Sequence, residues 1–320
     1  MKNRSIHNHI RLVQDIIDYR DMVEDEAYIL FLDFFKAFDT LEHTFLFQAL
    51  ELFGFGKVFC DFVKTCYADT NAAVSFTGGA TTRFPIQVGV KQGCPISPYI
   101  FLLAVEMLAI YLKNCPDLQT LTIFGSDITI SQLADDTTIF LKNKHQIPVA
   151  IKRIDTFSRA SGLRFNISKC ELMSIKESIN MTIDNIPVKN EIKYLGIYLT
   201  KEKQRSIKLN ITDAFHRGKT SLGRWQQRDL SIFGRIYLTK MEFLSRCIYP
   251  SHSLAIPRNE MNAVNQANFH FIWKNKTHYG KKRNVVKDFP QEGLKAIDFY
   301  CLNDFYCLKI NWLKAFFKEQ

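Results

Sequence analysis

The chain has 320 residues, of which 47% are hydrophobic and 23% charged, and these proportions exclude a globally disordered protein. This length suits one large domain or two modest ones. The longest apolar run, residues 99–112, contains Glu106 and is too short to span a bilayer. The polar N-terminal sequence is unlike a signal peptide, so we expect an intracellular protein in the cytoplasm or nucleus, neither secreted nor bound to a membrane.

The charge is unevenly distributed, and the eight cysteines have no metal-binding spacing. Residues 1–200 hold 20 basic and 22 acidic side chains, whereas residues 201–320 hold 22 basic and 10 acidic ones. A strongly basic segment suits a polyanion such as nucleic acid, and a solvated basic face is the alternative. No C-x-x-C pair or His cluster completes a zinc site, so we interpret the cysteines as reduced thiols.

The first ninety residues predict two helices, a strand and a hairpin. Apolar residues at helical spacing predict a helix over 6–20, and a short apolar run predicts a buried strand over 27–34. A second helix is predicted over 39–54, where a glycine ends the pattern. Residues 72–90 alternate between apolar and polar around a Gly-Gly pair, which predicts a hairpin.

The following residues continue this mixture of helices and strands. A serine and a proline open an almost wholly apolar segment over 97–115, which predicts a buried helix. Residues 127–142 form two short strand patterns, 147–160 have helical spacing, and 192–200 predict one further strand. Beyond residue 203 the pattern is mainly helical and rich in aromatic and basic residues, so we place a boundary near 200.

Carboxylates lie at the ends of predicted strands. Asp33 ends the apolar run 27–34, and Asp135 and Asp136 separate two strand patterns. A carboxylate at the edge of a buried strand is costly without compensation, and for a lone aspartate a salt bridge or turn cap is the usual answer. Two Mg²⁺ ions about 3.5–4 Å apart compensate such groups in enzymes that transfer phosphoryl groups. Aspartates on adjacent strands provide the hard oxygen ligands that this chemistry needs.

Five short segments resemble the palm motifs A to E of reverse transcriptases, in order and spacing: FLDFFKAFDT (31–40), QGCPISPYIF (92–101), LADDTTIF (133–140), SGLRFNISKCE (161–171) and YLGIYL (194–199). Three later segments resemble the thumb of LINE-type (non-LTR) retrotransposon enzymes and the parts that follow it: RWQQRDLSIFGRIYLTK (224–240), FIWKNK (271–276) and EGLKAIDFYCLNDFYCLKINWLK (292–314). The chain therefore resembles the polymerase core of a LINE-type reverse transcriptase over nearly its whole length.

The resemblance implies an α+β fold. It predicts a right-hand polymerase palm, in which helices pack on one face of an antiparallel sheet, followed by a mainly helical thumb and C-terminal segment. In these terms residues 1–20 are a remnant of the fingers or a connecting helix, and 21–200 are the palm. Residues 201–255 are then the helical thumb, and 256–320 a basic helical C-terminal segment.

The resemblance also implies catalytic roles for four residues. Asp33 and Asp135 match the two metal-binding aspartates, and Asp136 matches the supporting member of the pair, so all three are expected ligands or neighbours of two Mg²⁺ ions, with Mn²⁺ as a substitute. Lys169 matches the motif D lysine, a general acid for the pyrophosphate leaving group. A solvated surface lysine is the alternative for Lys169.

Other matched residues are expected to bind substrate. Phe38 matches the bulky residue that disfavours a 2′-OH, with ordinary core packing as the alternative. Gln92 and Gly93 match the motif B turn, which touches the incoming nucleotide and the templating base. The primer grip is matched by Tyr194, Leu195 and Gly196. Asp39 matches a motif A aspartate that we interpret as structural, for instance as a helix N-cap.

The resemblance implies an RNA-directed DNA polymerase whose partners are an RNA template, a DNA primer and deoxynucleoside triphosphates. Most of the fingers and the endonuclease of such elements are missing from these 320 residues, so we expect them to be inactive alone. A catalytically dead nucleic-acid-binding remnant is the main alternative, and a group II intron maturase is another that the thumb sequence disfavours. Three tryptophans in the basic part favour core packing over stacking on bases: Trp225, Trp273 and Trp312.

Overall fold

The computed structural model describes residues 5–23, 25–123, 125–176, 182–274, 282–291, 293–299 and 302. Contacts divide the chain into two units, one of residues 17–190 and one of residues up to 16 together with those from 191 onward. The helix α1 (Ile6–Val23), predicted from the sequence, belongs partly to each. The palm and thumb limits expected near 20, 200 and 255 stay predictions.

The first unit is built on a four-stranded antiparallel sheet in the order β10-β1-β9-β8. Its strands are β1 (Tyr28–Leu32), β8 (Ile130–Leu133), β9 (Asp136–Leu141) and β10 (Glu171–Ser174). Every residue of β1 is buried, as expected for an apolar strand with a partner on each side.

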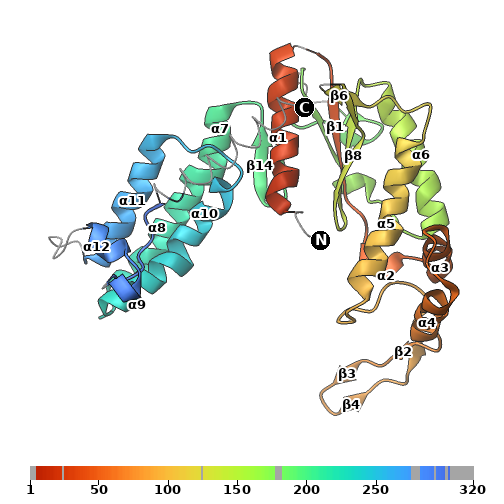
Figure 1. Ribbon diagram of the computed structural model, residues 1–320, viewed down its shortest axis with the longest axis horizontal. Coiled ribbons are helices and arrows are strands. Elements are labelled where there is room, and N and C mark those ends of the chain that lie inside the picture. The colour runs from red at the N-terminus through yellow and green to blue at the C-terminus, as the bar shows by residue number, and fades with distance from the viewer. Residues whose placement is uncertain are drawn as a thin grey trace. The chain divides into compact units, whose positions relative to one another are not determined.

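Helices pack beside this sheet and form one core with it. The long helix α5 (Ser97–Lys113) contacts β8, and it packs on α3 (His43–Leu52) and α6 (Gln146–Ser161). Figure 1 shows α5 and α6 on one side of the strands β1 and β8. Alternate residues of β1, from Tyr28 to Leu32, share a hydrophobic core with α5. The mixed helix and sheet architecture confirms the predicted fold class.

The remaining elements of this unit are short. They are α2 (Ala37–Thr40), α4 (Lys57–Tyr67), β2 (Asn71–Ala72), β3 (Ser75–Phe76), β4 (Gly79–Ala80), β5 (Phe84–Pro85), β6 (Leu121–Ile123), β7 (Ser126–Ile128), the 3-10 turn η1 (Ile167–Lys169), β11 (Thr182–Ile183) and β12 (Ile186–Pro187). β3 and β4 pair around the glycines of the predicted hairpin. In Figure 1 the ribbon of β2 to β5 extends beyond α4.

Two sequence predictions are wrong in detail. The helix expected over 39–54 is divided, because Leu41 is extended and α3 starts only at His43. Asp39 is therefore not an N-cap: it lies inside α2, and its carboxylate accepts a hydrogen bond from Gln92 instead. The single strand expected over 192–200 is a hairpin of β13 (Glu191–Tyr194) and β14 (Ile197–Thr200).

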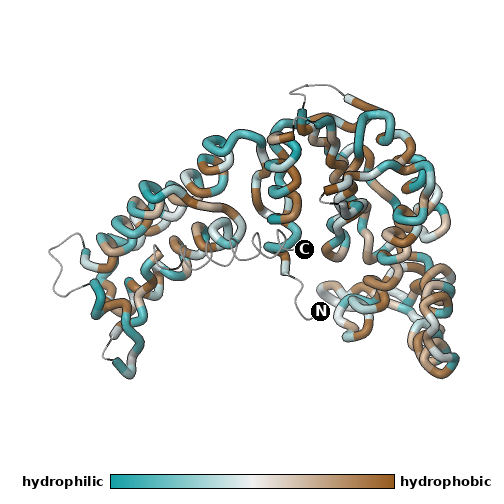
Figure 2. Tube along the Cα trace, turned by 45° about the horizontal axis from the view of Figure 1, so that its top comes forward, coloured by the Kyte–Doolittle hydropathy of each residue, from teal (hydrophilic) through white to brown (hydrophobic). Residues whose placement is uncertain are grey.

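Helices dominate the second unit after its hairpin. They are α7 (Lys203–Ile207), the π-helical turn η2 (Lys208–Thr212), α8 (Asp213–Gln226), α9 (Ile232–Leu238), the π-helical turn η3 (Thr239–Leu244), α10 (Ser245–Ser251), α11 (Arg258–Ile272), α12 (Lys282–Val286) and the 3-10 turn η4 (Phe289–Gln291). Brown and teal alternate along these helices in Figure 2, as expected for amphipathic segments.

Close packing explains how these helices form a core. Gly218 on α8 faces Phe243 on η3, and a Cβ at position 218 would lie 2.7 Å from the Phe243 ring. Trp273 is buried in a hydrophobic cluster, and Trp225 packs partly against another, in agreement with the predicted packing role. Trp312 lies outside the described residues. None of the described helices combines the length and the apolar composition that a membrane span requires.

Candidate active site

Three carboxylates are placed by neighbouring strand ends. Asp33 follows the last residue of β1, and Leu32 is paired with Thr137 on β9. Asp136 opens β9 and pairs with Leu133, so that Asp135 lies in the two-residue turn between β8 and β9. Antiparallel pairing therefore brings the end of β1 and this turn to the same edge of the sheet, as the sequence predicted.

Electrostatics shows that the three groups influence one another. Partial burial of the Asp136 carboxyl raises its pKa, and the negative charges of Asp135 and Asp33 raise this pKa further. Within the described residues, no three His, Cys, Asp or Glu side chains converge as a ready-made metal cage. Mg²⁺ in phosphoryl-transfer sites usually takes only one or two carboxylates and completes its shell with phosphates and water. The donor chemistry here fits that pattern.

The turn that carries Asp135 is strained. Ala134, its first residue, has φ 57°, a left-handed conformation that costs an L-residue about 1–2 kcal/mol. Two-residue hairpin turns of this kind require positive φ at their first position and favour glycine there. Strain of this size persists where the surrounding structure over-determines the backbone, as it often does at functional turns.

Backbone pairing beyond β1 holds Asp33 and brings Lys169 to it. The carbonyl oxygen of Asp33 accepts a hydrogen bond from the Asn166 amide at 2.8 Å, and the Phe35 amide donates to Arg164 at 2.7 Å. The turn η1 follows directly and ends at Lys169, whose Nζ lies 3.9 Å from Asp33 Oδ2. Motifs A and D thus meet at one carboxylate.

Phe38 lies on α2 and is half-buried. Its ring centroid is 4.3 Å from that of Phe101, a buried residue of α5, and it packs against the main core. The structure therefore gives Phe38 a packing role, and a role in sugar selection stays a prediction.

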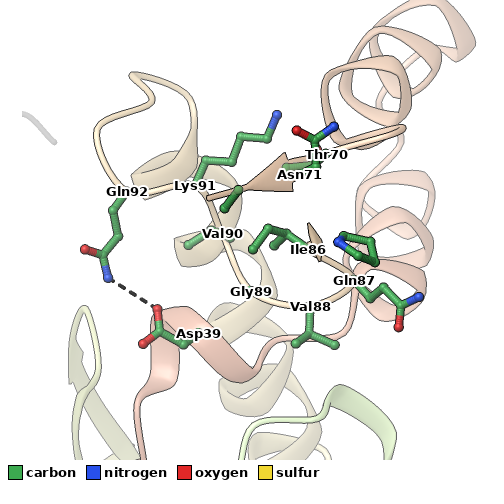
Figure 3. A pocket seen from close by; sticks show the side chains of 12 residues that line it. Asp39, Thr70, Asn71, Ile86, Gln87, Val88, Gly89, Val90, Lys91 and Gln92 are labelled. Atoms are coloured by element: carbon green, nitrogen blue, oxygen red, sulfur yellow. Dashed lines mark hydrogen bonds between the residues drawn. The ribbon is translucent and has the colours of Figure 1, made fainter. Parts of the chain in front are cut away.

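The motif B residues lie at the end of an irregular loop. Gln92 and Gly93 are both exposed, and the Gln92 side-chain amide donates to Asp39 Oδ1 at 3.3 Å. Figure 3 shows this side chain reaching toward Asp39 while Lys91 points away. The loop borders a cavity of about 630 Å³, lined by Asp39, Thr70–Ala72 and Pro85–Gln92. Sequence reasoning assigned Asp39 a structural role but not this partner.

The expected primer grip is the β13–β14 turn of the second unit. Leu195 and Gly196 both have positive φ, 47° and 82°. Leu195 is therefore a non-glycine residue in the left-handed conformation. The Tyr249 hydroxyl on α10 donates a hydrogen bond to the Leu195 carbonyl. A Cβ at Gly196 would approach the Tyr249 ring to 3.3 Å. No sequence pattern indicated this role of Tyr249.

Comparison with known proteins agrees with this geometry. Residues 1–199 match the family described as reverse transcriptase (RNA-dependent DNA polymerase). The chain therefore belongs to the reverse transcriptase family. Its relatives are proteins of non-LTR elements, which confirms the resemblance to LINE-type reverse transcriptases. Membership implies the use of divalent metal ions in general.

Two curated relatives and one solved structure define the similarity. The transposon TX1 149 kDa protein of Xenopus laevis is 26% identical over 282 residues, 84% of this chain and 21% of that protein. The R2DM Pol polyprotein of Drosophila melanogaster is 29% identical over 189 residues, 54% of this chain and 18% of that protein. Apo telomerase of Candida tropicalis shares the fold with a TM-score of 0.50 and 11% identity, over 84% of this chain and 45% of that one. The chain thus spans about a fifth of the curated relatives' length.

Proposed function

We propose that the chain is the polymerase core of a LINE-type reverse transcriptase, which extends a DNA primer on an RNA template with deoxynucleotides. The observation that carries the proposal is the meeting of Asp33, Asp135 and Asp136 at one sheet edge, where their charges interact. Asp33 and Asp135 would hold two Mg²⁺ or Mn²⁺ ions, with Asp136 in support. When bound, such ions neutralise charge that develops on the transferred phosphoryl group.

The chain's own residues would then position and protonate the reactants. The primer 3′-hydroxyl loses its proton to solvent, and its oxygen forms a bond to the α-phosphorus while the bond from that phosphorus to the pyrophosphate oxygen breaks. Lys169 is placed beside Asp33 and would donate its Nζ proton to the departing pyrophosphate. Phe38 would fill the space that a 2′-OH needs, because its ring is held against Phe101.

Binding of the two strands is assigned to the remaining motif residues. Gln92 and Gly93 are exposed to solvent, where they would meet the nucleotide and the templating base. The turn Tyr194–Gly196 would hold the primer, because glycine at position 196 allows the protein backbone to come close to the nucleic acid. The excess of basic over acidic residues in 201–320 supports contact with phosphates.

Primer extension tests the proposal. The purified chain is given a primed RNA template, deoxynucleotides and Mg²⁺ or Mn²⁺, and is compared with the same chain carrying a relative's fingers segment before residue 1. We expect Asp135→Asn to abolish extension in whichever form is active, with little change in affinity for the primed template. Asp61→Asn, which alters an exposed aspartate on α4, is the matched control.

Two outcomes would contradict the proposal. If Asp135→Asn extends primers as well as the parent protein, the assignment of the site is wrong. If both forms bind the primed template tightly and neither extends it, the chain is a catalytically dead nucleic-acid-binding protein.

A further inference from the structure

The loop that ends at Gln92 is hydrogen-bonded through its backbone to α2 and to Leu41, the residue that follows α2. The Gly89 amide donates to the Leu41 carbonyl and the Val90 amide to the Phe38 carbonyl, each at 2.7 Å. These bonds join the loop to Phe38 of motif A and to Leu41, the residue just after the motif. The position of Gln92 therefore depends on how firmly Gly89 and Val90 are held.

Gly89 allows this close contact. Its φ is 83°, and a Cβ at position 89 would lie 2.8 Å from both the Phe38 carbonyl oxygen and the Asp39 Cα. Real Cβ atoms essentially never come so near, and a side chain would also be strained at this φ. The loop backbone therefore packs directly against the short helix α2, which carries Phe38 and Asp39.

His43 provides the side chain that secures this contact. Its Nε2 lies 2.7 Å from the Gly89 carbonyl oxygen. A carbonyl oxygen only accepts, so His43 is the donor, in the tautomer that carries a hydrogen on Nε2. The ring stands edge-on to Tyr67 with centroids 4.8 Å apart, and it lies near Phe47. The hydrogen bond to Gly89 and the contact with Tyr67 orient this half-buried ring, at the first residue of α3, toward the loop.

A neighbouring contact holds the same loop from the α4 side. Lys91 donates from Nζ to the Cys66 carbonyl and lies over the Tyr67 ring, 5.4 Å from its centroid. Tyr67 in turn shares a hydrogen bond with Ser97 at the start of α5. The loop is therefore clamped on both sides, and Gln92 is presented at its end toward Asp39, as Figure 3 shows.

We propose that His43 is a positioning residue: by donating to the Gly89 carbonyl, it fixes the loop so that Gln92 is presented to the incoming nucleotide and the templating base. The role of Gln92 rests on the function proposed above, whereas the fixing of the loop does not. His43 itself touches neither the carboxylates nor the substrate in this account.

Hydrogen–deuterium exchange on the full chain tests the fixing of the loop. His43→Phe keeps an aromatic ring against Tyr67 and removes the donor, whereas His43→Gln keeps an N–H donor. We expect the amides of Gly89 and Val90 to exchange about fivefold to tenfold faster in His43→Phe, as loss of one hydrogen bond implies, and His43→Gln to recover part of the protection. Amides inside α5 should be unchanged and serve as the internal reference.

Primer-extension kinetics tests the consequence. We expect His43→Phe to raise the KM for deoxynucleotides about fivefold to tenfold with a smaller change in kcat, and His43→Gln to restore it partly. Unchanged exchange at Gly89 and Val90 in His43→Phe would overturn the proposal, as would an equal rise in exchange throughout α5, which indicates general loosening. If Asp135→Asn retains extension while the loop loosens in His43→Phe, the polymerase assignment fails and the fixing of the loop stands.

Discussion

Lys169 Nζ lies 3.9 Å from Asp33 Oδ2, although the two residues are far apart in the sequence. The cause is backbone pairing: residues 33–35 exchange hydrogen bonds with 164–166, and η1 then turns Lys169 toward the sheet edge. Both side chains are substantially exposed, so this ion pair contributes little to stability. Its significance is that it holds the Lys169 ammonium beside a carboxylate of the candidate active site, where the proposed function would use it as a proton donor.

Lys169→Ala should therefore slow primer extension while leaving the fold intact. We expect a loss of about 10²-fold in rate, at the lower end of what a general acid contributes, and a thermal midpoint close to that of the parent protein. Lys169→Arg should recover little, because a guanidinium is a poor proton donor. Single-turnover extension measures the rate, with the exposed Lys142→Ala as control. A rate within twofold of that of the parent protein would show that Lys169 is an ordinary solvated surface lysine.

Asp136→Asn should stabilise the protein, and the gain should depend on pH. Partial burial first, and then the charges of Asp135 and Asp33, raise the folded-state pKa of Asp136 above 3.8. The native state then binds this proton more tightly than the unfolded state, so the group opposes folding increasingly as the pH rises from 3.8 through the folded pKa. Urea unfolding should show a gain in free energy at pH 7 that shrinks toward pH 4. A gain of equal size at both pH values would refute the coupling.

Phe38→Val should increase the incorporation of ribonucleotides and should cost about 1–2 kcal/mol of stability, because the half-buried ring packs on Phe101. Competition between ribo- and deoxyribonucleotides in primer extension measures the discrimination. Phe59→Val is the matched control, since Phe59 is also partly buried against the same core. If both variants discriminate as the parent does, Phe38 is only a core residue.

Tyr249→Phe should destabilise the second unit by about 1 kcal/mol, because it removes the hydroxyl that donates to the Leu195 carbonyl. Leu195→Gly should relieve the positive φ of the same turn. A double-mutant cycle from thermal or urea unfolding gives the coupling between the two changes, and we expect a nonzero value. Tyr237→Phe, at an exposed tyrosine, is the control. Equal stability of the two Phe variants would show that the hydroxyl does not support the turn.

The sequence predicted those parts of the fold that depend on local patterns. The buried strand β1 and the helices α5 and α6 have unambiguous apolar periodicity, and each appears within a few residues of its expected limits. The strands that pair with β1 were harder to predict, because they are far away in the chain: Leu32 pairs with Thr137 of β9, and Phe31 pairs with Glu171 of β10. The resemblance to motifs A and C, not periodicity, indicated that Asp33 and Asp135 share one edge.

The sequence did not reveal residues whose importance comes from a single distant contact. His43 meets Gly89 and Tyr249 meets Leu195 across 46 and 54 residues. A lone polar side chain on an amphipathic helix has no periodic signal that distinguishes such a role from ordinary packing. The turn at Gly196 was not predicted for a related reason. Residues 192–200 are apolar enough to resemble one continuous strand, whereas they form a hairpin.

Site-directed cleavage by bound Fe²⁺ tests the central claim, that the end of β1 and the β8–β9 turn form one divalent-metal site. Fe²⁺ takes the place of Mg²⁺ on hard oxygen ligands and, with ascorbate and peroxide, cuts the backbone next to its binding site. We predict cleavage near Asp33 and near Asp135 in the same preparation, suppressed by excess Mg²⁺ and lost in Asp135→Asn. Cleavage confined to other segments, or unchanged in Asp135→Asn, would contradict the account.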